Sequence, residues 1–325
     1  MKQGPPRLQH YVPQLLLRQF AGADGKLWAY DVENRRMFAS NPKGLASEGF
    51  FYGGTGKHAT RGSTAIESWL AQEIERPGAD AIAQLLARRQ LSIEQMQAFL
   101  KFVATQMYRT PASLQRTSDC FAPSFQETAE RIAKHVPEVR ENIIADIKAT
   151  GATEQDVSQM LQILNEGKFT VTPTREFALY MAFSNLELVA NELRKMRWEF
   201  GSVPQSDCDL ILGDHPVTLA DVAGENAPAK PLGLRNPTIE IAMPLSSRMV
   251  ALAHWDGPIR YGELAPGVAD AINERTLRQI HRFAFASFES KDLLKRAIAL
   301  RGTGPKMRTR RLQKGEKLLM WTEFS

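Results

Sequence analysis

A long helical stretch with strand patterns on both sides is the feature that most constrains how this chain can fold. From about residue 64 to 197, apolar residues recur at the spacing of amphipathic helices. Strand patterns precede this stretch at 27–38 and follow it between 198 and 254. Because strands from both ends of a chain can share a sheet, we predict an α+β fold. In it, a helix-rich middle layer packs on a mixed sheet of N-terminal and C-terminal strands.

Capping and proline signals divide the helical stretch. They are capping-box pairs at Thr64/Glu67 and Ser92/Gln95, an interruption at Pro77-Gly78, and a break or kink at Pro137. These signals predict helices over 124–149, 153–165 and 174–197. After the strands, a further helix is expected from about Val268 through His281.

The length of 325 residues allows one large domain or two closely packed ones. Its 43% hydrophobic and 24% charged residues are ordinary globular values, which exclude a wholly disordered chain, a collagen and a coiled-coil rod. We interpret residues 1–290 as a single α+β domain and residues 291–325 as a basic C-terminal segment.

The first polar motif, His10-Tyr11-Val12-Pro13, stands directly before a short helix. A helix N-terminus carries free N–H donors and a positive partial charge, so it suits an anion. His10 is therefore a candidate catalytic residue, as a proton donor or metal ligand, and a structural histidine bonded to the backbone is the alternative. Arg18, about two helical turns later, is a second catalytic candidate or the partner in a surface ion pair.

The second motif is Asp214-His215, which follows the apolar strand pattern at 210–212 and is stiffened by Pro216. Polar residues held at the end of a strand are common catalytic positions. Both residues are catalytic candidates, and Asp214 is also a candidate metal ligand. The alternative is a turn in which the aspartate bonds backbone N–H groups.

An arginine at a helix end and an acidic helix complete the candidate site. Arg109 can clamp a phosphate or carboxylate with two parallel hydrogen bonds, or it can simply complement the helix macrodipole. Glu67 and Glu73 are candidate metal ligands for Mg²⁺ or Mn²⁺. Together with Glu75 they do not share one face at about 100° per residue, so a solvated acidic face is the alternative.

The net charge of +5 is unevenly distributed along the chain. Residues 291–317 contain ten basic and two acidic residues, a net +8, so the rest of the chain carries −3. We expect nucleic acid or another polyanion to bind this segment, and a solvated edge strand is the alternative. The candidate contact residues are Lys306, Arg308, Arg310 and Arg311.

Targeting and thiol patterns favour a cytoplasmic protein without a membrane partner. We find no secretory signal pattern and no apolar run of the roughly 18 residues that a membrane helix needs. Cys120 and Cys208 lie far apart and form no CxxC pair, so we expect reduced thiols. The sequence contains no Walker A, GxGxxG, GxSxG or HExxH motif, which leaves those enzyme classes without motif support.

The motifs together resemble those of an uncharacterised, mainly bacterial family catalogued as domain of unknown function 4238. The resemblance covers about residues 8 to 290. It is carried by His10-Tyr11-Val12-Pro13-Gln14 with Leu17-Arg18 and Phe20, by Arg109-Thr110-Pro111, by Gly213-Asp214-His215-Pro216-Val217, by Met243-Pro244-Leu245-Ser246, and by Asn273 in a helix ending in Phe283-Ala284-Phe285. In the family the Gly-Asp-His-Pro-Val block more often reads Ser-Asp-x-Pro, so no role of a serine hydroxyl carries over to Gly213. The resemblance implies these positions and no activity.

Three hypotheses follow from these patterns. The first is a metal-dependent hydrolase of phosphodiester or nucleotide bonds, in which the histidines move protons and the arginines stabilise phosphate charge. The second is a non-catalytic nucleic-acid-binding or regulatory protein. The third holds that both motifs are architectural and lock the N-terminal helix onto the sheet. An open cleft shared by His10, Arg18, Arg109 and Asp214 favours the enzyme, whereas burial and mutual hydrogen bonding favour architecture.

Overall fold

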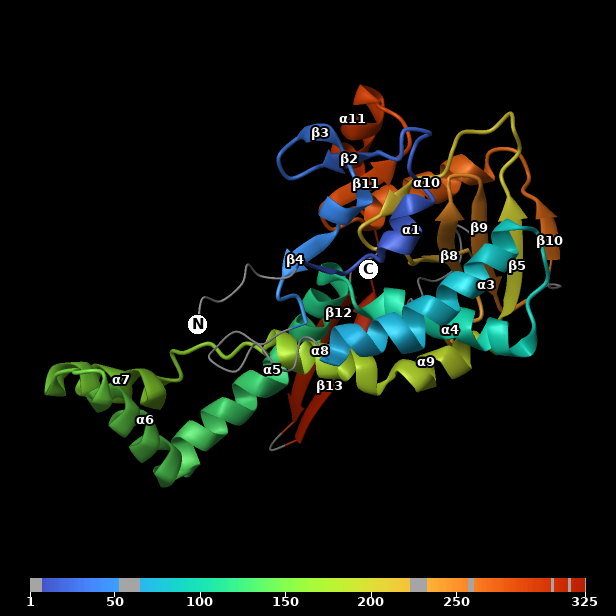
Figure 1. The fold of residues 1–325 in the computed structure, drawn as a ribbon. Helices are drawn as coiled ribbons and strands as arrows, with labels where there is room; N and C mark the ends of the chain where they lie inside the picture. The colour runs from blue at the N-terminus through green and yellow to red at the C-terminus, as the bar shows by residue number, and fades with distance from the viewer. Residues whose placement is uncertain are drawn as a thin grey trace.

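The chain has the predicted α+β architecture, with most of its helices in the middle of the sequence and its strands on either side (Figure 1). The computed structural model describes residues 8–52, 65–222, 233–256, 260–304, 307–314 and 317–324. The capping-box residue Thr64 and the basic residue Lys306 lie outside the described residues.

The strands are divided among separate sheets, and this corrects the expectation of one mixed sheet. The larger sheet has the order β10-β5-β9-β8-β7 and is antiparallel except for the parallel pair β10 and β5. Its strands are β5 (Arg197–Ser202), β7 (Thr218–Asp221), β8 (Ile239–Ser246), β9 (Met249–His254) and β10 (Arg260–Glu263). The sequence patterns did not predict β7 and β10.

A second, four-stranded sheet combines strands from the two ends of the chain. Its order is β3-β2-β11-β6, and each neighbouring pair is antiparallel. Its strands are β2 (Leu27–Asp31), β3 (Arg36–Ser40), β6 (Leu212–Gly213) and β11 (Phe283–Ala286). The predicted β2–β3 hairpin is confirmed, whereas Phe283–Ala286 forms a strand and not the end of a helix.

Two small antiparallel pairs accompany these sheets. β1 (Leu8–His10) pairs with β4 (Ser47–Gly49), and β12 (Met307–Lys314) pairs with β13 (Lys317–Phe324). The second pair is an antiparallel ribbon in the basic C-terminal segment, and its strand β12 also contacts α5.

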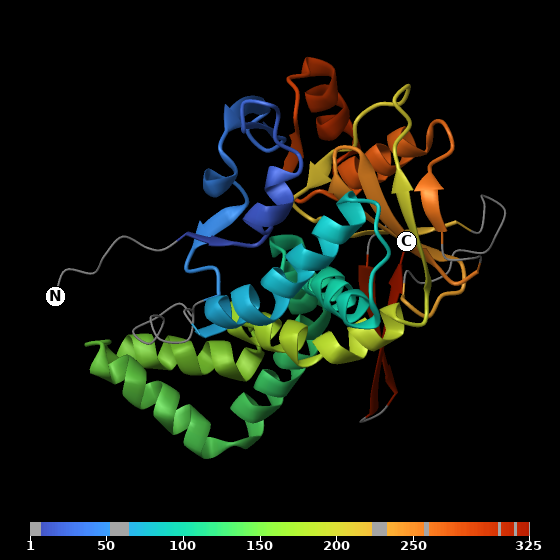
Figure 2. The same cartoon turned by 45° about the vertical axis from the view of Figure 1, so that its right-hand side comes forward.

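The helices cover the sheets and extend beyond them. They are α1 (Gln14–Arg18), the 3₁₀ turn η1 (Pro42–Gly44), the π-helix η2 (Leu70–Glu75), α3 (Arg76–Leu86), α4 (Ile93–Tyr108), α5 (Pro111–His135), α6 (Pro137–Ala149), α7 (Glu154–Glu166), α8 (Arg175–Ser184), α9 (Leu186–Leu193), α10 (Val268–Gln279) and α11 (Lys291–Leu300). Figures 1 and 2 show that α6, α7 and the end of α5 project from the rest of the molecule.

Local signals set several helix boundaries as predicted. Ser92 and Gln95 form the expected capping box at the start of α4, and Pro137 separates α5 from α6. Pro77-Gly78, however, does not interrupt its helix. The helical turns run without a break from residue 65 to Leu86, and the wide π turns over Leu70–Glu75 come directly before Pro77, whose ring and missing N–H do not fit a regular α-helical turn.

The single helix expected over 174–197 is two helices, α8 and α9, which meet at Asn185. Its backbone is non-helical, with φ −100° and ψ 3°, and its side-chain amide donates to the carbonyl of Met181 at 2.8 Å. Short amide side chains compete with the helix for backbone groups in this way, which explains the break.

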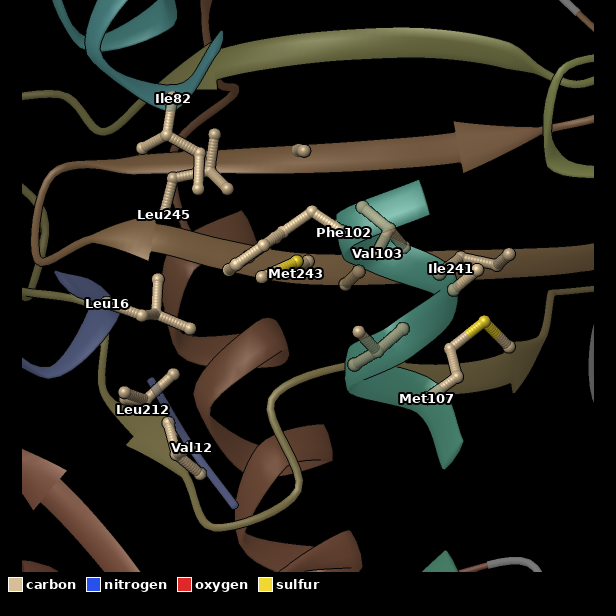
Figure 3. Packing of buried hydrophobic residues seen from close by; sticks show 14 of the residues in the cluster. Val12, Leu16, Ile82, Phe102, Val103, Met107, Leu212, Ile241, Met243 and Leu245 are labelled. Atoms are coloured by element: carbon tan, nitrogen blue, oxygen red, sulfur yellow. The ribbon is translucent and has the colours of Figure 1, made fainter. Parts of the chain in front are cut away.

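The main core lies where the N-terminal motif, α4 and the larger sheet meet (Figure 3). Val12 and Leu16 pack there with Phe102 and Val103 of α4 and Met243 of β8. A second, smaller core contains Leu293 and Ala297 of α11, so the start of the basic segment packs against the body. The first core contains Val12 of the first polar motif and Val217, which follows the second motif closely.

Gly78→Ala tests how tightly this core is packed. A Cβ at residue 78 would lie 2.8 Å from the Cβ of Phe102, which cannot move without shifting α4. Helix propensity alone favours alanine by about 1 kcal/mol. We expect the clash to dominate and lower the free energy of unfolding by about 1–3 kcal/mol in urea titrations. Ala83 is exposed on the same helix, so Ala83→Gly measures the effect of helix propensity on stability without a change in core packing. A Gly78→Ala protein as stable as wild type would contradict this packing.

Candidate functional site

Arg109 joins three separate parts of the chain. It caps the C-terminal end of α4, and its side chain is 1% exposed. Its Nε donates to the carbonyl of Tyr11 at 2.9 Å, Nη2 donates to the carbonyl of His10 at 2.7 Å, and Nη1 donates to Oε1 of Glu75 at 2.8 Å. The guanidinium therefore clamps the N-terminal motif to the π-helix and does not face an open phosphate site.

His10 is half-buried at the end of β1. Its Nε2 lies 3.1 Å from the carbonyl of Lys43, which can only accept, so Nε2 carries the hydrogen. Burial lowers the pKa of His10, although the bond to the Lys43 carbonyl opposes this shift. The imidazole is accordingly neutral near pH 7. The backbone carbonyl of His10 accepts from the Tyr52 hydroxyl at 2.8 Å as well as from Arg109.

Arg18 does not reach back to His10. Its guanidinium is exposed and donates to Oε1 of Gln14 at 3.2 Å within α1. The enzyme hypothesis places four catalytic candidates together in one open cleft. The structure does not show that arrangement. Arg109 contacts the backbone of His10, while Arg18 lies on the solvent side of its own helix.

Asp214 is 1% exposed and accepts three backbone N–H groups of one segment. Oδ1 accepts from His281 at 2.8 Å, and Oδ2 accepts from Arg282 at 2.6 Å and from Phe283 at 2.8 Å. Burial raises the pKa of Asp214, and these N–H donors oppose that shift. The carboxylate ties the loop after β6 to the start of β11. The sequence predicts an aspartate that bonds backbone N–H groups of its own turn, whereas the donors lie in the distant segment 281–283.

His215 is buried in a closed hydrogen-bond network at the start of α5. Arg116 Nη2 lies 2.8 Å from His215 Nε2 and must donate, so Nε2 accepts and Nδ1 carries the hydrogen. Nδ1 then donates to the Thr110 hydroxyl at 2.9 Å, which donates to Ser113 Oγ at 3.1 Å. Ser113 in turn donates to the Met107 carbonyl. Burial lowers the pKa of His215 well below its ordinary value, so the ring is neutral.

The network continues from Asp214 to the N-terminal hairpin through Arg282. Arg282 donates its backbone N–H to Asp214, and its guanidinium binds both carboxylate oxygens of Asp31 at 3.0 and 2.8 Å. Burial would raise the pKa of Asp31, but the hydrogen bonds from Arg282 and Asn34 outweigh it and lower this pKa to about 2. Asp31 is therefore ionised throughout the neutral range.

Two adjacent pairs, Arg109-Thr110 and Asp214-His215, thus connect most of the site. Within each pair the two side chains contact different segments, and Thr110 bonds His215 directly. Sequence reasoning named three of these four positions as candidates but missed their partners Glu75, Arg116, Asp31 and Tyr52. Of these four, only Glu75 carried a sequence signal, as one of three glutamates on an acidic helix.

The three candidate metal ligands do not come together. Glu67 lies 3.4 Å from the amide of Gln9, Glu73 is exposed, and Asp214 is occupied by backbone donors. Among the described residues no three His, Cys, Asp or Glu side chains could hold a metal ion. Binding of Mg²⁺ or Mn²⁺ stays a prediction.

The basic candidates that the structure describes lie on β12. Arg308, Arg310 and Arg311 pair in register with residues 323, 321 and 320 of β13. In α11, Lys295 is exposed, whereas Arg296 forms an ion pair with Asp270 at 3.0 Å. The segment therefore combines the helix α11 with a two-stranded ribbon.

These observations define an α+β protein whose two polar motifs hold its segments together from inside. The chain belongs to the family described as "Protein of unknown function (DUF4238)", which it matches over residues 8–290. Comparisons with curated proteins and with solved structures gave no match. In the described part of the chain, no helix combines the length and the apolar character needed to cross a membrane.

Arg109→Lys tests the clamp. Lysine keeps the charge, but one ammonium cannot bridge Glu75 and two carbonyls in this geometry. We expect the free energy of unfolding to fall by about 3–5 kcal/mol, because buried acceptors and Glu75 lose their partner. Arg18→Lys, an exposed control, should change it by less than about 0.5 kcal/mol. Equal effects of the two variants in urea titrations would contradict the clamp.

The Asp31–Arg282 pair predicts a specific loss of stability in acid. The pKa of Asp31 is about 2 in the folded chain against 3.8 for the free side chain. Its contribution is therefore complete above pH 4 or so and disappears as the pH falls towards 2. Asp31→Asn should lower the melting temperature at pH 7, and the difference from wild type should shrink below about pH 4. A difference independent of pH would contradict the low pKa.

Proposed function

We propose that this protein binds nucleic acid through its basic C-terminal segment, and that both polar motifs act in its architecture rather than in catalysis. The charge separation carries the proposal: residues 291–317 hold a net +8, while the rest of the chain holds −3. Such a cluster releases counterions from a phosphate backbone when it binds, which is the main source of affinity for nucleic acid.

The shape of the segment supports this proposal. β12 and β13 form an antiparallel ribbon of eight paired positions, and the two strands point away from the two larger sheets (Figure 2). A two-stranded ribbon fits the major groove of duplex DNA. Arg308, Arg310 and Arg311 concentrate the positive charge on one of its two strands.

The burial and internal hydrogen bonds of the motif residues support the architectural half of the proposal. Arg109, Asp214 and His215 are buried and bonded to partners within the chain. A catalytic group must present a donor, an acceptor or a charge to a substrate. The hydrogen bonds of these three side chains join segments of the chain. The metal-dependent hydrolase is therefore the less favoured hypothesis.

Neutralising the ribbon tests the proposal. For the triple variant Arg308→Gln, Arg310→Gln, Arg311→Gln we expect weaker binding to labelled duplex DNA or single-stranded RNA. The slope of log affinity against log salt should fall by about 3, since each phosphate contact contributes about 0.9. Fluorescence anisotropy between about 50 and 200 mM salt measures both quantities.

The matched control removes three charges elsewhere. Lys26, Arg89 and Arg194 are exposed and lie outside the basic segment, so their replacement by glutamine changes the net charge equally. Equal losses in the two variants, or no binding by wild type at low salt, would overturn the proposal. We expect nucleic acid to stay intact when it is incubated with the protein and Mg²⁺ or Mn²⁺. Cleavage would overturn the proposal that the polar motifs are not catalytic.

A further inference from the structure

Arg116, in the second turn of α5, extends the His215 network with a half-buried guanidinium. Its Nη2 donates to Oγ of Ser113 at 3.1 Å and to Nε2 of His215 at 2.8 Å. Both acceptors are neutral, because Ser113 offers a hydroxyl and burial keeps the His215 ring uncharged. These bonds therefore hold the guanidinium in place without compensating its charge.

No carboxylate binds Arg116 among the residues that the structure describes. Two other buried or half-buried arginines of the site differ in this respect, because Arg109 pairs with Glu75 and Arg282 pairs with Asp31. The difference extends to the pKa values. Burial lowers the pKa of Arg116, whereas the hydrogen bonds to Asp31 raise the pKa of Arg282. A partly desolvated cation without a counter-ion favours the binding of an anion.

The Nε and Nη1 atoms of Arg116 are available to a ligand. Nη2 makes the two bonds to Ser113 and His215, while Nε and Nη1 make no hydrogen bond to any described residue. They also reach the surface. In the described part of the chain, the fully buried side-chain nitrogen and oxygen atoms without a partner belong to Gln106 and Arg275. A ligand can therefore approach the free N–H groups of Arg116 from solvent.

Tyr108 supplies a second donor beside this guanidinium. Its half-buried phenol, at the end of α4, interacts electrostatically with Arg116. Burial raises the pKa of Tyr108, so the hydroxyl keeps its proton near pH 7. This hydroxyl makes no hydrogen bond to a described residue, and it is not fully enclosed either. A cation and a neutral O–H donor thus lie together where α4 meets α5, and neither is bonded to a carboxylate there.

We propose that Arg116 and Tyr108 bind the oxyanion of a small ligand, namely a phosphate or carboxylate group. Nε and Nη1 of Arg116 donate charge-assisted hydrogen bonds to its oxygens, and the Tyr108 hydroxyl donates a further one. His215 and Ser113 are positioning residues, because they hold Nη2 and thereby fix the plane of the guanidinium. This site does not rest on the binding of nucleic acid proposed above.

Inorganic phosphate and acetate are the probes, and sodium chloride at equal ionic strength is the reference. Calorimetry on the full chain near pH 7 should show saturable binding of phosphate, of acetate or of both, which tells a phosphate site from a carboxylate site. The bound anion should also raise the melting temperature above its value in chloride, because it binds the folded chain. The proposal is wrong if neither anion binds and neither stabilises the protein more than chloride does.

The basic ribbon could also attract these anions, so a ribbon variant separates the two sites. The variant Arg308→Gln, Arg310→Gln, Arg311→Gln should bind the anion as wild type does, because Arg116 is unchanged. Loss of anion binding in this variant, with binding retained by Arg116→Gln, would place the anion on the ribbon and overturn the proposal.

Arg116→Gln should weaken binding of the anion by about tenfold or more, because charge-assisted hydrogen bonds are lost. Arg18→Gln removes the same charge from an exposed position on α1 and should leave binding unchanged. Tyr108→Phe removes one hydroxyl and no packing, so it tests the site even if Arg116→Gln does not fold. It should weaken binding by about threefold or more. Tyr180→Phe, at a side chain that is 69% exposed, is its matched control. Wild-type affinity in Arg116→Gln or in Tyr108→Phe would contradict the proposed site.

Discussion

The buried guanidinium of Arg109 is the interaction on which the arrangement of this chain depends. A charge inside a protein costs several kcal/mol unless it is paired and its hydrogen bonds are complete. Arg109 meets that condition with one carboxylate and two backbone carbonyls, which come from Glu75, His10 and Tyr11. The π-helix, the N-terminal strand and the end of α4 must therefore assemble together, because any one of them alone leaves the charge uncompensated.

Chain adjacency extends this constraint across the molecule. Thr110 follows Arg109 and bonds His215, and Asp214 precedes His215 and binds the backbone at 281–283. Arg282, in that last segment, reaches Asp31 of the N-terminal hairpin. The helical layer is thus linked to the four-stranded sheet by pairs of residues that are adjacent in sequence but bond to different segments. Each polar motif is therefore a short local pattern, although the partners of its two residues are distant.

The features that could be predicted depend on neighbouring residues. Ser92 and Gln95 bond across one helical turn, and the β2–β3 hairpin closes through a short turn, so composition and spacing suffice. The division of the strands into two sheets depends instead on which distant strands pair, and a run such as Phe283–Ala286 carries no signal for its neighbours β2 and β6. Likewise, Arg109 and Asp214 make five of their six side-chain hydrogen bonds to backbone groups, which every residue has.

Arg109, Asp214 and His215 are bonded to partners within the chain, so the proposed binding of nucleic acid relies on side chains outside this network. The basic C-terminal segment meets that requirement, because its ten basic residues lie beyond the two motifs in sequence. Its ribbon is nevertheless joined to the body, since β12 contacts α5, the helix that begins next to Arg109 and Thr110. The hydrogen bonds that hold the fold and the charge proposed for binding therefore belong to different parts of the chain.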